Sequence, residues 1–216
     1  MDNTKKKEKI QRCLEFIKKE YEKDTSGHDY WHSYRVWKLS KIISKREKIN
    51  LESKFYIEIS AILHDIDDWK FSKSYEKTIK LLENLDFNKS EIKRIIKIIK
   101  EISYKGTFRK PETKEAQIVQ DADRLDAIGA IGIARTFTYG GYKKRKIYDP
   151  NIKPKKPKNF KDYKKNQSTT INHFYEKLLL IKKNLNTKTA KEIAKKRHNF
   201  MVKYLKNFYD EWNLKI

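Results

Sequence analysis

The sequence predicts an all-α protein that folds as a single domain. Three observations support this class: apolar residues recur at spacings of three and four, no stretch alternates as a strand does, and only four prolines and six glycines interrupt 216 residues. The length suits one sizeable core, and no stretch in the middle of the chain reads as a linker between two cores. The hydrophobic content of 38% argues against disorder of the whole chain.

Apolar spacing predicts a series of helices in the first half of the chain. They cover residues 5–23, about 28–43, 51–65 and 73–85, and a further helix follows a cap at Ser90 and runs to about residue 102. In the second of these helices, His32 lies on the same stripe as the apolar residues. The helix at 51–65 becomes most apolar toward its end, where His64 and Asp65 occur.

A long helix is predicted from a cap at Thr113 to about Phe137, and we expect it to be central because both of its faces are apolar. It contains several small residues, among them Gly129 and Gly132. A glycine inside a helix costs about 1 kcal/mol relative to alanine, so close packing or a site is the expected reason for them.

The last third of the chain contains a basic segment between two groups of helices. Tyr139-Gly140-Gly141-Tyr142 ends the long helix, and residues 143–166 then carry three of the four prolines and many lysines. A connection longer than about 12 to 15 residues is unusual in a compact domain, so this one is expected to be a functional lid or mobile. Two more helices are predicted after Ser168.

The formal net charge of +23 raises the question of a nucleic-acid partner, because clustered lysines and arginines release counterions from polyanions. Most lysines, however, are spread over the solvent faces of predicted helices, and lysine, asparagine and isoleucine are all abundant. We therefore favour a solvated basic surface and keep nucleic acid as a secondary partner.

The single cysteine, Cys13, excludes an intramolecular disulfide and a cysteine-based zinc cluster, and it is expected to be a core thiol. The N-terminal residues lack an apolar signal core, and no segment approaches the roughly 18 apolar residues that a membrane span needs. The sequence thus predicts a cytoplasmic protein without a membrane partner.

Histidines and carboxylates recur in three segments, 27–36, 62–68 and 120–126, at places where the periodicity predicts the core. A histidine or an acid left unpaired there costs several kcal/mol. One histidine on an apolar face is more often a satisfied core residue than a ligand, but three such segments together favour a metal site. His32, His64, Asp65 and Asp123 are the candidate ligands, and this set suits a divalent first-row metal better than calcium or structural zinc.

These residues resemble the H…HD…D pattern of the HD-domain metal-dependent phosphohydrolases. Residues 28–36 and 121–137 are similar to the small single-domain bacterial YpgQ/YedJ-like branch, and the resemblance extends into residues 173–179 and 197–201, so that it covers most of the chain apart from the basic loop. The resemblance implies an all-helical HD-type bundle, a divalent metal ion (Mn²⁺ or Mg²⁺ before other first-row metals) and hydrolysis of a phosphate ester or anhydride, with nucleotides as the usual substrates. It also implies Asp123, in preference to Asp121 or Asp126, as the fourth ligand.

The other candidate residues follow from their positions around this pattern. Asp68 occupies the place where relatives have an acid that activates water or protonates the leaving group, although a solvated or capping acid is an equal alternative. Arg35 and Arg124 are candidate catalytic groups for phosphate oxygens, or buried ion-pair partners of the acids. Candidate substrate-binding residues are His28, Lys70, Asp126, Tyr139, Lys177 and Arg197; His28 is equally a helix cap, and Asp126 could instead orient a ligand.

The favoured function is cleavage of a nucleoside or deoxynucleoside triphosphate to the monophosphate and pyrophosphate. A nucleotidase or a phosphodiesterase of the same superfamily is the first alternative. A basic nucleic-acid-binding module, in which the metal is structural or absent, is the second.

Overall fold

The computed structural model describes residues 2–27, 29–67, 74–102, 108–155 and 168–215. These residues form helices joined by turns, with no strand among them, which confirms the all-α class. In chain order the elements are α1 (Asn3–Glu20), α2 (Tyr30–Arg46), α3 (Leu51–Leu63), α4 (Glu76–Asn84), α5 (Lys89–Ile102), α6 (Lys114–Asp126), α7 (Gly129–Tyr142), α9 (Thr170–His173), the π-helical turn η1 (Phe174–Leu178), α10 (Leu179–Ile181), the 3₁₀ turn η2 (Lys182–Asn184) and α11 (Lys188–Trp212).

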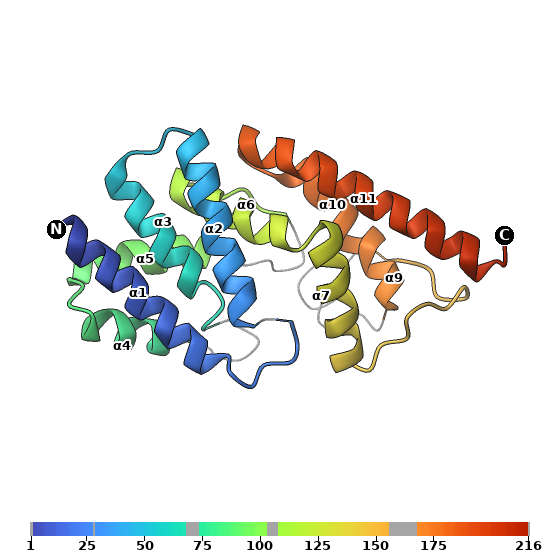
Figure 1. Cartoon of the computed structure of the whole chain (residues 1–216), viewed down its shortest axis with the longest axis horizontal. Helices are drawn as coiled ribbons and strands as arrows, with labels where there is room; N and C mark the ends of the chain where they lie inside the picture. The colour runs from blue at the N-terminus through green and yellow to red at the C-terminus, as the bar shows by residue number, and fades with distance from the viewer. Residues whose placement is uncertain (1, 28, 68–73, 103–107, 156–167, 216) are drawn as a thin grey trace.

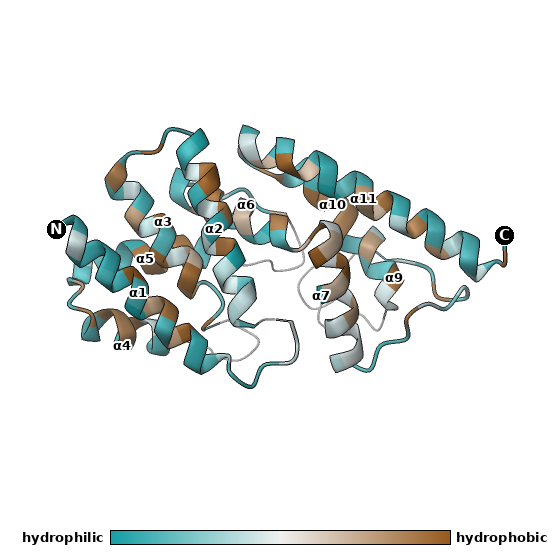
Figure 2. Cartoon of the chain, viewed as in Figure 1, coloured by the Kyte–Doolittle hydropathy of each residue, from teal (hydrophilic) through white to brown (hydrophobic). Residues whose placement is uncertain are grey.

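Helix α6 lies at the centre of the molecule (Figure 1). It packs against α2, α3 and α5 on one side and against α7 and α11 on the other, while the chain ends lie far apart. Hydrophobic and hydrophilic residues alternate along most of these helices (Figure 2), and the buried apolar residues form one core. Ile62, Leu63, Ile118 and Leu125 are fully buried, and so is Cys13, as predicted for a core thiol.

Side chains that cap helix N-termini fix several of these helices. Asp29, Asn50, Thr113 and Thr187 each accept a hydrogen bond from the backbone N–H three residues later. Thr113 was predicted as a cap.

The cap of α5 differs from the prediction. Asn88, not Ser90, caps that helix: its side chain accepts from Glu91 N at 3.0 Å, and the Glu91 carboxylate accepts from Asn88 N at 2.9 Å. In this capping box the Asn88 side chain and the Glu91 carboxylate are both acceptors, and the backbone N–H groups of Glu91 and Asn88 are the donors.

Helix α3 ends two residues earlier than the periodicity predicts. Its last residue is Leu63, so His64 and Asp65 lie in the turn that follows and not in the helix. The first helix likewise spans 3–20 in place of 5–23. Because the helix ends at Leu63, the successive side chains of His64 and Asp65 can point toward the same centre.

The predicted long helix at 113–137 is two helices. Helix α6 ends at Asp126, Ile128 is extended (φ −128°, ψ 160°), and Gly129, the first residue of α7, has φ +83°. A β-carbon on Gly132 would lie 2.3 Å from the carbonyl oxygen of Ala127, so α7 turns back tightly on the end of α6. The expectation that these glycines allow close packing is confirmed, but the packing bends the chain.

The described part of the predicted basic loop is bonded to the helices that follow it. Lys146 O and Ile147 O accept bonds from Thr170 N and Ile171 N, at 2.9 and 3.0 Å. Residues 156–166 of this segment lie outside the described residues. The first of the two helices predicted after Ser168 is itself interrupted, because a π-helical turn separates α9 from α10.

Over the part of the chain that the structure describes, no helix combines the length and the apolar composition that a membrane crossing requires.

Candidate metal centre

Three helices bring two imidazoles and two carboxylates to one point. His32 lies in the first turn of α2, because Asp29 caps that helix and accepts a bond from His32 N at 2.8 Å. His64 and Asp65 follow α3, and Asp123 lies in the last turn of α6. One ligand atom from each of His32, His64 and Asp65 lies within 4.8 Å of the others.

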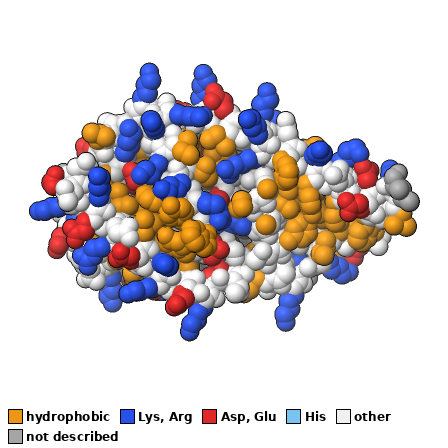
Figure 3. Space-filling view, in the orientation of Figure 1, with side chains coloured by type: hydrophobic (Ala, Val, Ile, Leu, Met, Phe, Trp, Pro, Cys, Tyr) orange, Lys and Arg blue, Asp and Glu red, His pale blue; other side chains and the backbone are white. Residues whose placement is uncertain are grey.

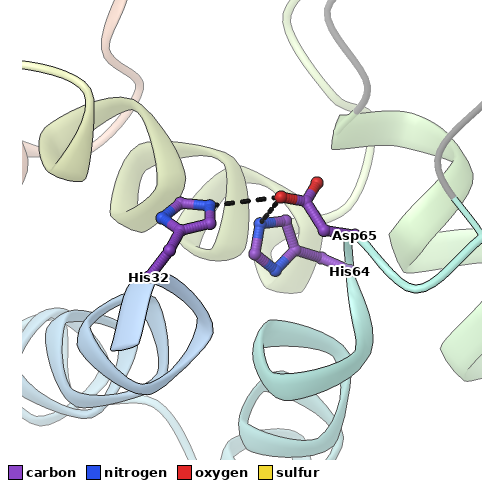
Figure 4. A group of neighbouring side chains, drawn as sticks. All are labelled: His32, His64 and Asp65. Carbon is purple, nitrogen blue, oxygen red and sulfur yellow. Dashed lines mark ion pairs between the residues drawn. The ribbon is translucent and has the colours of Figure 1, made fainter. Parts of the chain in front are cut away.

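The distances between these groups are those of neighbouring ligands. His32 Nε2 lies 3.3 Å from Asp65 Oδ2 and 3.6 Å from Asp123 Oδ1. His64 Nε2 lies 3.5 Å from Asp65 Oδ2 and 3.8 Å from Asp123 Oδ1. Figure 4 shows the carboxylate of Asp65 facing both imidazoles.

The other nitrogen of each imidazole is held by an acceptor. His64 Nδ1 lies 2.9 Å from the carbonyl oxygen of Ala61, and His32 Nδ1 lies 2.8 Å from Asp126 Oδ2. In a neutral imidazole, Nδ1 then donates its proton and Nε2 keeps a lone pair. In this neutral state each ring directs its Nε2 lone pair to the side on which the carboxylates of Asp65 and Asp123 lie, where a cation would accept it.

This arrangement fits a cation. Two lone pairs and two carboxylates converge, and His64 Nε2 is buried with no hydrogen-bond partner among the described residues. Burial and the nearby Arg135 lower the pKa of His32, but bonds to Asp126 and Asp65 outweigh them and raise the pKa above its ordinary value. The raised pKa shows that the carboxylates favour positive charge at this point. A divalent metal ion would supply such charge and would bind all four acceptors at once.

The centre is accessible on its carboxylate side. The side chains of His32 and His64 are 1% and 3% exposed, whereas those of Asp65 and Asp123 are 18% and 35% exposed. A metal ion held here would keep coordination positions open to a small molecule, which distinguishes catalytic from structural sites.

Asp126 lies behind the centre and orients His32. Its carboxylate is 2% exposed and also accepts bonds from Arg35 Nε (2.7 Å), Arg35 Nη2 (3.0 Å) and Arg135 Nη1 (3.2 Å). Burial raises the pKa of Asp126, but the bonds from His32 and Arg35 lower it well below its ordinary value. The Asp126 carboxylate is enclosed and holds His32 Nδ1, which favours the alternative that it orients a ligand, and its substrate-binding role stays a prediction.

Two of the predicted arginines bind backbone carbonyls near the centre. Arg124 is 7% exposed, donates to Asn184 O and lies over the ring of Phe108, so it joins α6 to η2. Arg197 donates to Leu125 O and thereby ties α11 to the end of α6. Each guanidinium group therefore has a backbone partner, and the catalytic role of Arg124 and the substrate contact of Arg197 stay predictions.

None of the hydrogen bonds and ion pairs described for the centre involves the remaining predicted residues. Tyr139 lies near the end of α7, with Lys143 and Arg145 beside its ring, and Lys177 lies in the π-helical turn. Their substrate contacts stay predictions. His28, Asp68 and Lys70 lie outside the described residues.

Arg135 is a residue of the site that the sequence did not reveal. It lies on α7 and donates from Nε to Gly27 O at 2.8 Å as well as to Asp126. A signal was present in Gly129 and Gly132, which mark the break after which Arg135 reaches the turn before α2.

These features define an all-helical protein with a candidate centre for a divalent metal ion. The chain belongs to the HD domain family. Residues 30–128 match the model of the HD domain, and this span contains the four candidate ligands.

Relatives match almost the whole chain. The uncharacterized protein YpgQ of Bacillus subtilis is 35% identical over 190 residues, which cover 85% of this chain and 83% of that protein. The structure of YpgQ in complex with ADP has a TM-score of 0.74 and 30% identity, with 94% and 97% of the two chains covered.

Two other solved structures are similar over nearly their full length. A protein from Lactobacillus plantarum has a TM-score of 0.87 and 34% identity, with both chains fully covered. A protein described as an HD-superfamily hydrolase, from Bacillus thuringiensis, has a TM-score of 0.73 and 42% identity, with 96% and 98% covered.

Proposed function

We propose that this protein is a metal-dependent phosphohydrolase of nucleotides, and that its favoured reaction cleaves a nucleoside or deoxynucleoside triphosphate to the monophosphate and pyrophosphate. The observation that carries the proposal is the convergence of two imidazole nitrogens and two carboxylate oxygens at a point that is open on one side. The ADP complex of the relative YpgQ supports a nucleotide as substrate.

The chain would prepare this centre before a substrate arrives. A Mn²⁺ or Mg²⁺ ion held by His32, His64, Asp65 and Asp123 would polarise a phosphoryl oxygen and lower the pKa of a coordinated water. Asp126 and the carbonyl of Ala61 fix the two imidazoles, so the ligands need little rearrangement on binding.

Among the lysines and arginines that the structure describes, Arg35 is the best placed to contact a substrate bound at the metal centre. Its guanidinium holds Asp126 with Nε and Nη2, yet the side chain remains 32% exposed. We assign it a contact with phosphate oxygens, for which a guanidinium group has suitable geometry. The proton transfer predicted for Asp68 remains part of the proposal.

Product analysis tests the reaction. Purified protein is incubated with one nucleoside triphosphate and Mn²⁺ or Mg²⁺, and the products are separated by ion-exchange chromatography. Monophosphate with pyrophosphate supports the favoured reaction, whereas diphosphate or nucleoside with free phosphate indicates the nucleotidase alternative. In ¹⁸O-labelled water, the label shows which phosphorus is attacked.

Asp65→Ala removes one ligand and is expected to abolish hydrolysis. Asp210→Ala is the matched control, because it removes a carboxylate that pairs with Lys206 on the surface of α11. The proposal fails if wild-type protein leaves triphosphates, diphosphates and aryl phosphates intact with either metal, or if Asp65→Ala remains as active as Asp210→Ala.

A further inference from the structure

Arg135 connects two parts of the chain that flank the metal centre. Its Nε donates to the carbonyl of Gly27, in the turn before α2, and its Nη1 donates to Asp126 at the end of α6. The arginine itself belongs to α7. One side chain therefore joins α7, the end of α6 and the turn that leads into the helix of His32.

The contact is too enclosed to be an ordinary surface ion pair. The side chain of Arg135 is 17% exposed and its partner Asp126 is 2% exposed. Asp126 in turn holds His32 Nδ1 at 2.8 Å, and His32 is 1% exposed. Contacts of this kind behind a metal-ligating histidine fix its tautomer and the orientation of its ring.

We propose that Arg135 is a positioning residue of the metal centre: by bridging the Gly27 carbonyl and the Asp126 carboxylate, it holds Asp126 where it orients His32. The inference rests on the metal centre of the proposed function and not on its substrate.

Arg35 does not make this bridge redundant. It comes from the same helix as His32 and binds Asp126 through two nitrogens, so it ties α2 to α6. Arg135 approaches the carboxylate from a third helix and also holds the turn before α2 through the backbone of Gly27. The placement of α7 is thereby linked to the orientation of a metal ligand.

Metal affinity without substrate is the first test, measured by isothermal titration with Mn²⁺. Arg135→Ala is expected to weaken Mn²⁺ binding about 10-fold to 100-fold, as changes behind ligands do. Arg135→Lys keeps the charge, but a single ammonium group lacks the planar fork that serves two acceptors, so an intermediate affinity is expected.

Arg94→Ala is the matched control for general destabilisation. Arg94 also binds two acidic side chains, Glu52 and Glu115, on the α3, α5 and α6 side of the molecule. The inference is overturned if Arg135→Ala binds Mn²⁺ as wild type does, if Arg94→Ala loses as much affinity, or if Arg135→Lys restores wild-type affinity, since charge alone would then suffice.

A second readout uses metal-free protein. The ¹⁵N and ¹H signals of the His32 imidazole report whether Nδ1 carries the bonded proton. Arg135→Ala is expected to speed exchange of that proton and mix the two tautomers, and an unchanged spectrum would overturn the inference. Neither readout involves a nucleotide. If the protein hydrolysed no nucleotide but Arg135→Ala showed both effects, the proposed function would be refuted and the role of Arg135 would stand.

Discussion

At the scale of single residues, two buried aspartates of α6 bind different parts of the chain. Asp121 is fully buried and accepts bonds from the backbone and side chains of Asn186 and Thr187, which fixes the start of α11. Asp126, five positions later, accepts from His32 and two arginines. The first carboxylate joins α6 to the start of α11, and the second holds His32, a candidate metal ligand.

Replacing each aspartate by asparagine separates these roles. Both Asp121→Asn and Asp126→Asn are expected to lower the free energy of unfolding by about 3 kcal/mol, because each leaves buried donors without a charged acceptor. Only Asp126→Asn is expected to weaken Mn²⁺ binding. Urea denaturation with a chelator present and metal titration measure the two quantities. Equal metal affinities for the two variants would contradict the role assigned to Asp126.

The candidate ligands His32, His64, Asp65 and Asp123 stand out in the sequence because acids and histidines are rare in apolar stripes. Arg135 does not stand out, for a physical reason. On one continuous helix, nine residues would separate it from Asp126 by about 13 Å along the axis and place it on the opposite face. Only the break at residues 127–128 brings the two side chains together.

At the scale of the elements, this break is the feature that periodicity could not predict. A stripe at three-and-four spacing runs through residues 113–137, and the turn between α6 and α7 does not interrupt it. The glycines at 129 and 132 were the signal in the sequence that α7 packs closely against a neighbour. Their positions indicated close packing, but not which neighbour would approach.

Two glycines of α7 give a matched test of the break. Gly132→Ala is expected to lower the free energy of unfolding by about 1–3 kcal/mol, because the new β-carbon would meet the rigid carbonyl of Ala127 at 2.3 Å. Gly141→Ala meets nothing within 4 Å and is expected to be neutral or stabilising by up to about 1 kcal/mol. Thermal and urea unfolding measure both, and similar effects would contradict the close approach of α7 to Ala127.

Glu47, just after α2, helps to hold the start of α11. Its carboxylate accepts bonds from Thr189 N at 3.0 Å and from the Thr189 hydroxyl at 2.8 Å, and Lys114 lies 3.4 Å away. These groups, the Thr189 N–H above all, hold the pKa of Glu47 below its ordinary value although burial opposes them. A carboxylate at this end of a helix also complements the helix dipole.

Glu47→Gln is expected to lower the free energy of unfolding by about 1 kcal/mol at neutral pH. Because the folded pKa is depressed, this contribution is complete above the unfolded value of about 4.3 and disappears as the pH falls through the lower folded value. Urea denaturation from pH 7 to pH 3 measures it. The exposed Glu8→Gln in α1 is the control, and a difference from wild type that stayed constant with pH would contradict the charge-based explanation.

At the scale of the whole molecule, composition and periodicity predicted the all-α class, and the segments rich in histidine and acid predicted which helices would meet. They could not predict how closely α6, α7 and α2 approach, since this depends on packing between elements. The basic charge remains the least specific signal. Lysines and arginines project from all around the visible face and do not gather in one patch (Figure 3).

This dispersed charge predicts weak oligonucleotide binding that does not involve the metal centre. Affinity for a random single strand, measured by fluorescence anisotropy, is expected to fall by about tenfold or more between 50 and 200 mM salt, because the contacts are to phosphates and release counterions. Asp65→Ala is expected to leave this binding unchanged, since the dispersed lysines are unaltered, while it abolishes nucleotide hydrolysis. Binding that persisted at 200 mM salt would contradict the phosphate-based explanation, and binding that required Asp65 would place nucleic acid at the metal centre.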